Sequence, residues 1–445
     1  MPIATGAGTS CDPRPRYRSP IGDYPGPSER PATLRTTVPE VLDRPATRAA
    51  LGVLLVALAA RHAVQVADGG LQDFSAYYRG AWGAVHRLDP YDLRNPGGLL
   101  PFIYPPFAAL VLGPLGLLPQ EAAATAMTLV SLLALWVLAS TTIGALWPTT
   151  SRGIRTWACA GVVVLALTTE PVWATLGLGQ VNLVLAALVA VDMLRLRGTR
   201  WSGVLVGVAA GIKLTPAFFA LFLLAAGRPR DAARAAATFV GTVAVAGVLM
   251  PRPSWRYVTD GDFLFSLSEV GKAANQSLLG AWTRLAADED VVRWPWYLVA
   301  GLVAALGLWA AGRLDRAERT AEALVIAALT MLLVAPTSWT HYWVWVVPAA
   351  VVVAARTARR GPAAATLAAT ATLAPTLVGR RWFPPYPEVL VDHDDLASTF
   401  LDELYVLPGL VALLVVVAVS RRWRPDERSE QRSDDPPGGP AMLSA

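Results

Sequence analysis

The 445-residue chain is poor in charged residues, cysteine and histidine. Only 16% of its residues are Asp, Glu, Lys or Arg, against roughly 25% in soluble domains, which argues against a water-soluble globule. Its two cysteines, Cys11 and Cys159, are too few for a disulfide framework or a cysteine-based metal cluster. The four histidines have no second His or Cys at ligand spacing, so the sequence predicts neither a metal nor another cofactor. The arginines behind the net charge of +5 stand mainly in short loops beside apolar segments, which indicates membrane orientation and not nucleic-acid binding.

Long apolar runs are what the sequence has instead, with 54% of residues hydrophobic. Several approach the ~20 residues that a helix needs to cross a bilayer. Backbone groups cannot bond to lipid, so such continuous runs must be helical. We therefore expect an all-α polytopic membrane protein with about 10 to 12 crossing or dipping helices. The clearest runs are 122–146, 156–176, 235–250, 294–311, 321–334, 342–355 and 406–420.

Composition divides the chain into three parts. Residues 1–47 are rich in Pro, Arg, Ser and Thr and have no hydrophobic periodicity, which predicts a disordered cytoplasmic leader. Residues 48–420 form the membrane domain, and the charged, Pro/Gly-rich residues 421–445 form a disordered cytoplasmic tail. The apolar stretch at 49–60 comes too late, and has no cleavage site, for a removable signal peptide, so it starts the first span.

Arginine clusters predict the orientation of this domain in the cytoplasmic membrane. If all of them are cytoplasmic, segments 67–103, 251–292, 336–341 and 379–403 face outside. Two apolar segments then cannot cross: 201–227 enters and leaves on the inner side as a hairpin broken at Lys213-Leu-Thr-Pro216, and 105–118 dips from outside. The alternative makes both segments full spans. The clusters begin at Arg44, Arg152, Arg195, Arg228, Arg313, Arg356 and Arg421.

The first outer segment contains the best candidate for a catalytic base. From Phe74 to Leu88, apolar residues recur at helical spacing, which predicts an amphipathic helix on the membrane surface. Asp73 stands at its start, either as an N-cap or as a general base whose pKa is raised by partial desolvation. Tyr77 lies one turn away on the same face, and Tyr78 follows it.

Polar residues inside or beside the apolar segments are further candidates, because such positions are costly unless they serve a function. Gln180 and Asn182 either bind substrate or bond helix to helix. Lys213, one of only two lysines, needs an anionic partner, which is either a carboxylate or a substrate phosphate.

Two later motifs complete the set. Lys272-Ala-Ala-Asn275-Gln276-Ser277 in the long outer loop suits a sugar or acceptor site, although Asn275-Gln-Ser277 also matches a glycosylation acceptor. Trp339-Thr-His341 joins two apolar runs, and His341 there either bonds a phosphate oxygen or relays a proton, or is merely structural.

Taken in order, these motifs resemble the polyprenyl-phosphate-mannose-dependent mannosyltransferases of glycosyltransferase family 87, which have the GT-C membrane fold. The resemblance extends from about residue 70 to 350 and excludes the two tails and residues 379–403. Each motif is weakly specific, and their order and spacing carry the match. The matching elements are Asp73-Phe-x-x-Tyr77-Tyr78-x-Gly80-Ala, Tyr91-Asp92, Tyr104-Pro-Pro-Phe107, Gly179-Gln180-x-Asn182, Lys213-x-Thr-Pro216, Asn275-Gln-Ser277 and Pro336-Thr-Ser-Trp339-x-His341.

The resemblance implies an inverting transfer of mannose from a polyprenyl phosphate carrier to a lipid-linked glycan, such as a phosphatidylinositol mannoside, outside the cytoplasmic membrane. It implies that Asp73 is the general base and that Lys213 and His341 hold the phosphate. Tyr77, Tyr78, Gln180, Asn182, Asn275, Gln276 and Trp339 are the expected substrate-binding residues. Two alternatives stay open: a polyprenyl-phosphate-arabinose donor, which no motif separates from mannose, and a transporter or lipid-sugar flippase, which broken helices also fit.

Overall fold

The computed structural model describes residues 52–53, 71–93, 100–260, 270–285, 289–378 and 403–420. The predicted leader, the tail and nearly all of the first apolar stretch lie outside these residues, as does the expected outer segment 379–403 apart from its last residue.

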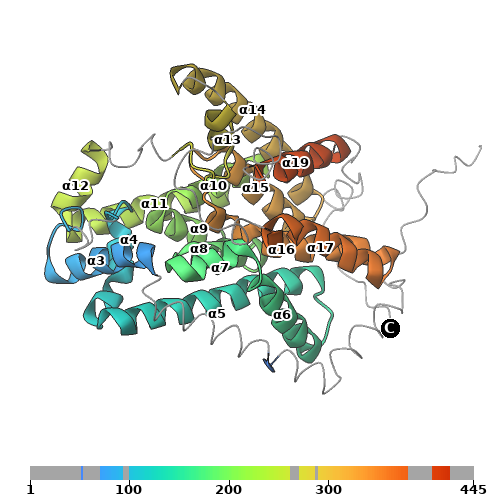
Figure 1. The fold of residues 1–445 in the computed structure, drawn as a ribbon, viewed down its shortest axis with the longest axis horizontal. Coiled ribbons are helices and arrows are strands. Elements are labelled where there is room, and N and C mark those ends of the chain that lie inside the picture. Colours follow the sequence, from blue (N-terminus) through green and yellow to red (C-terminus); the bar gives the residue numbers. More distant parts are fainter. Residues whose placement is uncertain are drawn as a thin grey trace, which may run out of the picture.

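The described chain is an array of helices, as the apolar runs predict (Figure 1). Its one β feature in these ranges is an isolated bridge between Asn275 and Trp339. The elements are α3 (Gln72–His86), α4 (Pro106–Leu112), η1 (Gly113–Leu117), α5 (Gln120–Leu146), α6 (Arg152–Ala166), α7 (Glu170–Leu178), α8 (Asn182–Leu194), α9 (Val204–Ile212), η2 (Thr215–Ala217), α10 (Phe218–Ala225), α11 (Pro229–Leu249), α12 (Pro251–Thr259), α13 (Leu278–Leu285), α14 (Glu289–Arg316), α15 (Thr320–Val334), η5 (Thr340–Trp345), α16 (Val346–Thr357), η6 (Ala358–Arg360), α17 (Pro362–Val378) and α19 (Val406–Ser420).

Three of the described helices are long and apolar enough to cross a bilayer: α5, α11 and the part of α14 from Pro295 to Arg316. The bent pair of α6 and α7 makes a fourth if it is one span, and five shorter apolar helices of 10–17 residues accompany them. The chain is thus a polytopic helical membrane protein. The expected total of about 10 to 12 membrane helices stays a prediction.

One expected continuous run is broken. Residues 156–176 form the end of α6 and most of α7, and the two helices meet at an angle of 78°. Thr168 and Thr169 turn their hydroxyls back to the carbonyls of Leu165 and Ala166, and Thr169 has extended backbone angles. Pro171 then lacks the N–H that would continue the helix. The sequence interpretation overlooked this Thr-Thr-Glu-Pro break, which turns α7 across the end of the bundle.

The arginine-rich loops gather at one end of the molecule. Arg197 pairs with the buried carboxylate of Asp315, which also lies 3.9 Å from Arg228. Arg228 in turn pairs with Asp231 at 2.8 Å. We call the end formed by residues 195–200, 228–234 and 313–320 the basic end. Its common position agrees with the predicted placement of these loops on one side of the membrane.

Segments 201–227 and 105–118 are the two that the sequence predicts not to cross the membrane. Arg228 donates to the Ser202 hydroxyl at 2.8 Å, so the start of α9 and the end of α10 meet at the basic end, and the chain between them is a hairpin broken at Lys213. α4 and η1 lie along α3, where Tyr78 donates to the Leu118 carbonyl at 2.8 Å. Gly116 permits this approach, because a Cβ there would lie 2.6 Å from the backbone nitrogen of Trp82.

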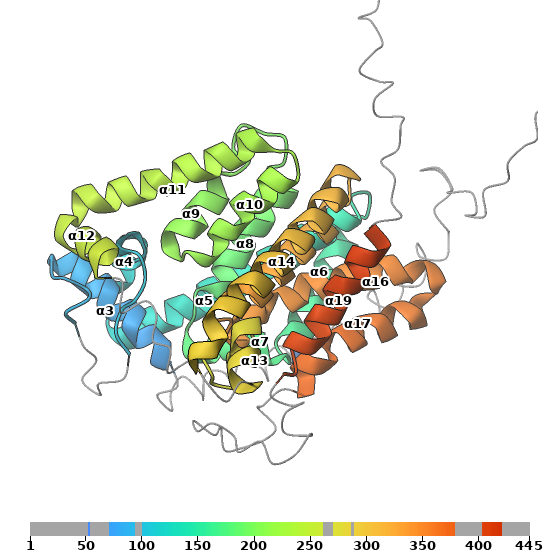
Figure 2. The same cartoon turned by 90° about the horizontal axis from the view of Figure 1, so that it is seen from above.

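The hairpin and α11 set the position of the opposite end. α11 packs along α9 and α10 and carries the chain from the basic end to α12, which lies beside α3 and α4 (Figure 2). The core between these layers consists largely of Ala, Leu and Val side chains. Four segments converge at the end of the molecule opposite the basic end: α3, the α7–α8 turn, the hairpin tip and η5.

Candidate active site

A buried polar cluster lies where these four segments converge. α3 supplies Asp73 and Tyr77, and the α7–α8 turn supplies Gln180. The first turn of α8 supplies Asn182, and the break in the hairpin supplies Lys213. His341 and Tyr342 come from η5. The fold therefore joins residues that are up to 269 positions apart in the chain, from Asp73 to Tyr342.

Local backbone geometry places Gln180. Gly179 caps the C-terminus of α7. Its φ of 69° lies in the left-handed region, which residues other than glycine rarely adopt. A Cβ at this position would lie 2.5 Å from the Cβ of Phe74 on α3. The glycine thus allows the α7–α8 turn to pack directly on α3, which brings the Gln180 amide to Asp73.

Gln180 connects the two polar residues of α3. Its Nε2 donates to Asp73 Oδ2 at 2.5 Å, and its Oε1 accepts from the Tyr77 hydroxyl at 2.7 Å. This amide is buried, so both bonds are shielded from solvent. Asp73 has no capping bond, because α3 begins at Gln72 with Leu71 as its N-cap. The N-cap interpretation of Asp73 is therefore wrong: the carboxylate turns toward the site.

The surroundings tune the Asp73 carboxyl. Burial is the largest influence and raises the pKa of Asp73 above its ordinary value. The Gln180 hydrogen bond and the Lys213 charge act in the opposite direction and lower this pKa, because both favour the ionised form. The combination leaves a carboxylate with increased proton affinity, as a general base requires.

Lys213 is held by neutral groups. Its Nζ donates to Asn182 Oδ1 at 3.1 Å and lies 3.9 Å from the ring centroid of Tyr342 and 5.5 Å from that of Tyr104. Among the described residues, no carboxylate forms a salt bridge with it, so the interpretation of Lys213 as one half of an ion pair finds no partner there. A buried ammonium with amide and aromatic neighbours is suited to an anionic ligand.

His341 closes the same side of the cluster. Its backbone carbonyl accepts from Thr175 at 2.9 Å and from Asn182 at 3.1 Å, which fixes η5 against α7 and α8. Its ring is buried edge-on to Tyr342, with centroids 4.9 Å apart. The buried Nε2 has no hydrogen-bond partner in the structure. Such an atom is costly unless a ligand satisfies it.

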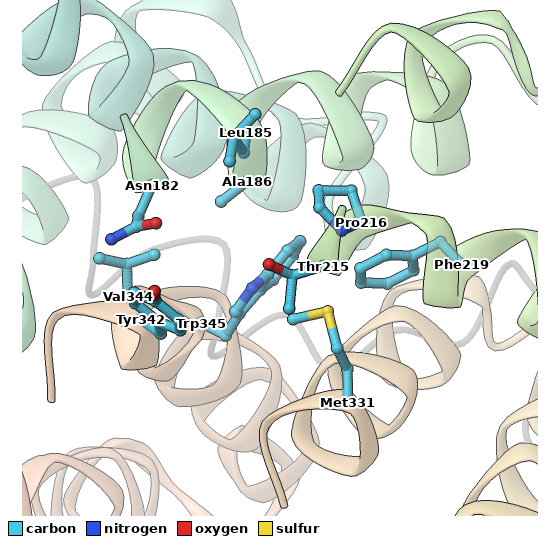
Figure 3. Close-up of a pocket in the computed structure, with 10 residues that line it drawn as sticks. All are labelled: Asn182, Leu185, Ala186, Thr215, Pro216, Phe219, Met331, Tyr342, Val344 and Trp345. Atoms are coloured by element: carbon cyan, nitrogen blue, oxygen red, sulfur yellow. The ribbon is translucent and has the colours of Figure 1, made fainter. Parts of the chain in front are cut away.

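A small cavity of about 30 Å³ adjoins Asn182 and Tyr342 (Figure 3). Thr215, Pro216 and Phe219 of the hairpin line another side, and the remaining lining is largely apolar. The volume is enough for about two water molecules. It continues the site toward the hairpin tip, where Leu214 is exposed.

Comparison with known proteins identifies the family of the chain. The sequence profile of glycosyltransferase family 87 matches residues 102–336, over half of the chain. The chain belongs to glycosyltransferase family 87. It is thereby a membrane glycosyltransferase of the GT-C class, and an enzyme.

Curated relatives of this family 87 chain come from mycobacteria. A polyprenol-phosphate-mannose-dependent alpha-(1-2)-phosphatidylinositol mannoside mannosyltransferase of Mycobacterium tuberculosis is 34% identical over 77% of this chain and 82% of its own length. A phosphatidylinositol pentamannoside mannosyltransferase of the same species is 35% identical over 79% of this chain and 81% of its own length. No solved structure matches the chain.

Three further expected site residues of the family 87 chain lie in its supporting loops. Asn275 is buried, accepts from the Ser338 N–H at 2.7 Å and donates to the carbonyls of Val270 and Pro336. An isolated β-bridge joins Asn275 to Trp339, which is half-buried. Gln276 Oε1 accepts from the Tyr405 N–H at 2.9 Å. The amides of Asn275 and Gln276 hold the loop that precedes His341. Substrate contact by these three residues, and by Tyr78, stays a prediction.

Sequence reasoning missed two aromatic residues of the site. Tyr104 stacks on Tyr77 with ring centroids 4.5 Å apart, and with Tyr342 it encloses Lys213. Tyr104 stands in the Tyr104-Pro-Pro-Phe107 motif, and Tyr342 directly follows the motif that ends at His341. Glu170, at the start of α7, is also buried, and its Oε2 accepts from the Tyr405 hydroxyl at 2.7 Å. In the described part of the chain, no group of acidic, His or Cys residues could hold a metal ion.

Proposed function

We propose that the chain transfers mannose from a polyprenyl-phosphate-mannose donor to a phosphatidylinositol mannoside, forming an α-1,2 linkage, on the outer face of the cytoplasmic membrane. Asp73 acts as the general base. Lys213 and His341 bind the donor phosphate, and Gln180 holds the base in position. The names of the mycobacterial relatives support the mannosyl donor and the phosphatidylinositol mannoside acceptor.

The observation that carries this proposal is the pairing of a proton-accepting carboxylate with an unneutralised buried ammonium. Asp73 and Lys213 are close enough for the lysine charge to influence the carboxyl, yet they form no salt bridge. The site therefore contains both a base and an anion-binding group. A transfer from a sugar phosphate requires both.

The chemistry follows from these positions. The acceptor hydroxyl attacks C1 of mannose and passes its proton to Asp73 as the new C–O bond forms. The bond between C1 and the phosphate oxygen breaks, and its electron pair leaves with polyprenyl phosphate. Lys213 and the His341 ring stabilise the charge that grows on that leaving group. Attack from the side opposite the phosphate inverts the anomeric centre.

The orientation rests on charge. The site lies away from the basic end, and arginine-rich loops favour the cytoplasmic side. α3, whose Phe74 and Tyr77 are buried within the protein, then lies on the outer side. A lipid-linked donor held in the bilayer would present its phosphate at this level.

Sugar transfer by membranes that contain the full chain tests the proposal. The substrates are radiolabelled polyprenyl-phosphate-mannose and phosphatidylinositol mannosides, and the chains are wild type, Asp73→Asn and Glu121→Gln. Glu121 is an exposed carboxylate at the start of α5, so its substitution is a matched control. We expect transfer by wild type and Glu121→Gln, and a loss of at least about 100-fold in Asp73→Asn, the range that a positioned base contributes.

Two outcomes would contradict the proposal. Equal transfer by Asp73→Asn, present at the same abundance, would remove Asp73 from the role of base. Transfer by wild type from a polyprenyl-phosphate-pentose but not from the mannosyl donor would replace mannose as the substrate and leave the base assignment to be tested with that donor.

A further inference from the structure

α12 is a short amphipathic helix that the transfer reaction does not use. It follows α11 after a break at Met250, whose backbone leaves the helical region, and Pro251 begins it. It lies at the site end of the molecule, beside α3 and α4 (Figure 2). Its position at the end of a candidate span makes it the first element to leave the apolar layer on this side.

The two faces of α12 differ in their surroundings. Pro253 is buried and Tyr257 is half-buried against the rest of the protein. Arg252, Trp255 and Val258 recur every three residues, so they share the opposite face. Arg252 is exposed, and the side chains of Trp255 and Val258 are 72% and 73% exposed. An exposed tryptophan and valine beside an arginine are typical of a helix at a lipid–water boundary.

This face continues a surface that already meets lipid. Val248 and Leu249 at the end of α11 are 79% and 63% exposed, and Val240 lies further back along the same helix. α11 is long and apolar enough to cross a bilayer, so its exposed valines and leucines face acyl chains. Trp255 and Val258 lie within ten residues of Val248 and Leu249 along the chain. The continuity selects the bilayer as the occupant of the α12 face.

We propose that α12 lies in the lipid–water boundary of the membrane, with Trp255 and Val258 among the upper acyl chains and Arg252 bonded to an anionic phospholipid headgroup. The inference concerns membrane contact alone and does not depend on the transfer reaction.

The same helix is attached to the site. Arg256 pairs with Asp92 at 2.5 Å and lies 3.4 Å from Asp89, both in the turn after α3. Tyr91 of that turn donates to the Tyr104 carbonyl at 2.7 Å, and the Tyr104 ring stacks on Tyr77. These contacts link α12 to the turn after α3 and, through Tyr104, to the site.

Site-directed spin labelling of the full chain in lipid vesicles tests this position. In a background without the two native cysteines, a nitroxide is placed at Val258→Cys. Val248→Cys on α11 is the lipid control, and Arg230→Cys, exposed at the basic end, is the water control. The measurement compares accessibility to oxygen, which concentrates in lipid, with accessibility to a water-soluble nickel chelate. Trp255→Cys serves as a second position on the same face.

We expect labels at 258 and 255 to be reached by oxygen more than by nickel, at a shallower depth than the label at 248. Nickel accessibility equal to that of Arg230→Cys would overturn the proposal. Protection from both reagents would also overturn it, since it would place a protein surface, such as a second copy of the chain, on this face.

Vesicle composition tests the headgroup contact. In phosphatidylcholine vesicles that also contain phosphatidylglycerol, the label at 258 should become less accessible to nickel than in phosphatidylcholine alone. Arg252→Gln should abolish this difference. A difference that persists in Arg252→Gln would remove Arg252 from the contact.

Discussion

Replacing Gln180 with leucine should shift the pH dependence of the enzyme without removing its base. Leucine is close to glutamine in size but cannot donate a hydrogen bond. The change deletes the 2.5 Å bond from Gln180 Nε2 to Asp73 Oδ2 and leaves the Asp73 carboxyl in place. Burial raises the pKa of Asp73. Of the two influences that lower this pKa, only the Lys213 charge then remains.

The size of the shift follows from the strength of the lost bond. A hydrogen bond to a charged group is worth roughly 1.5–3 kcal/mol, and one pKa unit corresponds to about 1.36 kcal/mol. The ionised form of Asp73 therefore loses roughly 1.5–3 kcal/mol of stabilisation in Gln180→Leu, which raises the pKa of Asp73. A base must be ionised to accept a proton, so activity is lost as the pH falls through this pKa. The acid limb of the rate profile should therefore move to higher pH.

The assay measures kcat/KM for the mannosyl donor against pH, because this ratio reports ionisations in the free enzyme. Tyr77→Phe is the matched comparison, since it deletes the 2.7 Å bond to the other side of the Gln180 amide and retains the bond to Asp73. Its acid limb should move less. Glu121→Gln, on an exposed carboxylate, should leave the limb unmoved.

An acid limb at the wild-type position in Gln180→Leu would refute the reasoning, because Asp73 would then not be the group that the limb reports. A shift to lower pH would contradict the sign of the Gln180 contribution.

The other predictions concern the anion site and the supporting loops. Lys213→Met should lower kcat/KM for the donor by about 10- to 100-fold, since a charge-assisted bond of roughly 1.5–3 kcal/mol is lost. Lys213→Arg should recover part of this loss, and initial rates against donor concentration measure both variants. An unchanged kcat/KM in Lys213→Met would remove the phosphate role of Lys213. Arg284→Met should destabilise the protein by about 3–5 kcal/mol, because it leaves the buried carboxylate of Glu403 without the arginine that lies 2.7 Å away. The double variant with Glu403→Leu should melt at a higher temperature than Arg284→Met, and an equal or lower melting temperature would contradict this account.

Much of the membrane architecture was predictable because it depends on composition over short stretches. Apolar runs near span length required helices, and the arginine loops implied that the chain between Ser202 and Arg228 returns to the side from which it came. The structure confirms that return through the bond between these two residues. The break at Thr168 and Thr169 was missed because apolar residues flank it on both sides and the run retains its hydrophobicity.

The candidate site was predictable only as a set of residue types. A lysine within an apolar segment and a carboxylate beside an amphipathic helix are each costly to bury, so their positions alone marked them as candidates. Nothing local indicated that Gln180 would reach across 107 residues to Asp73, or Asn182 across 31 residues to Lys213.

The sequence alone thus determined that the chain is a helical membrane protein and which polar residues were worth explaining. These properties follow from hydrophobicity and charge that each segment carries by itself. The tertiary structure decided that Asp73 is no helix cap, that Lys213 has aromatic neighbours, and that Asn275 and Gln276 hold loops. Those outcomes depend on which surfaces pack together, as when Gly179 allows the α7–α8 turn to reach α3, and packing is a property of the whole chain.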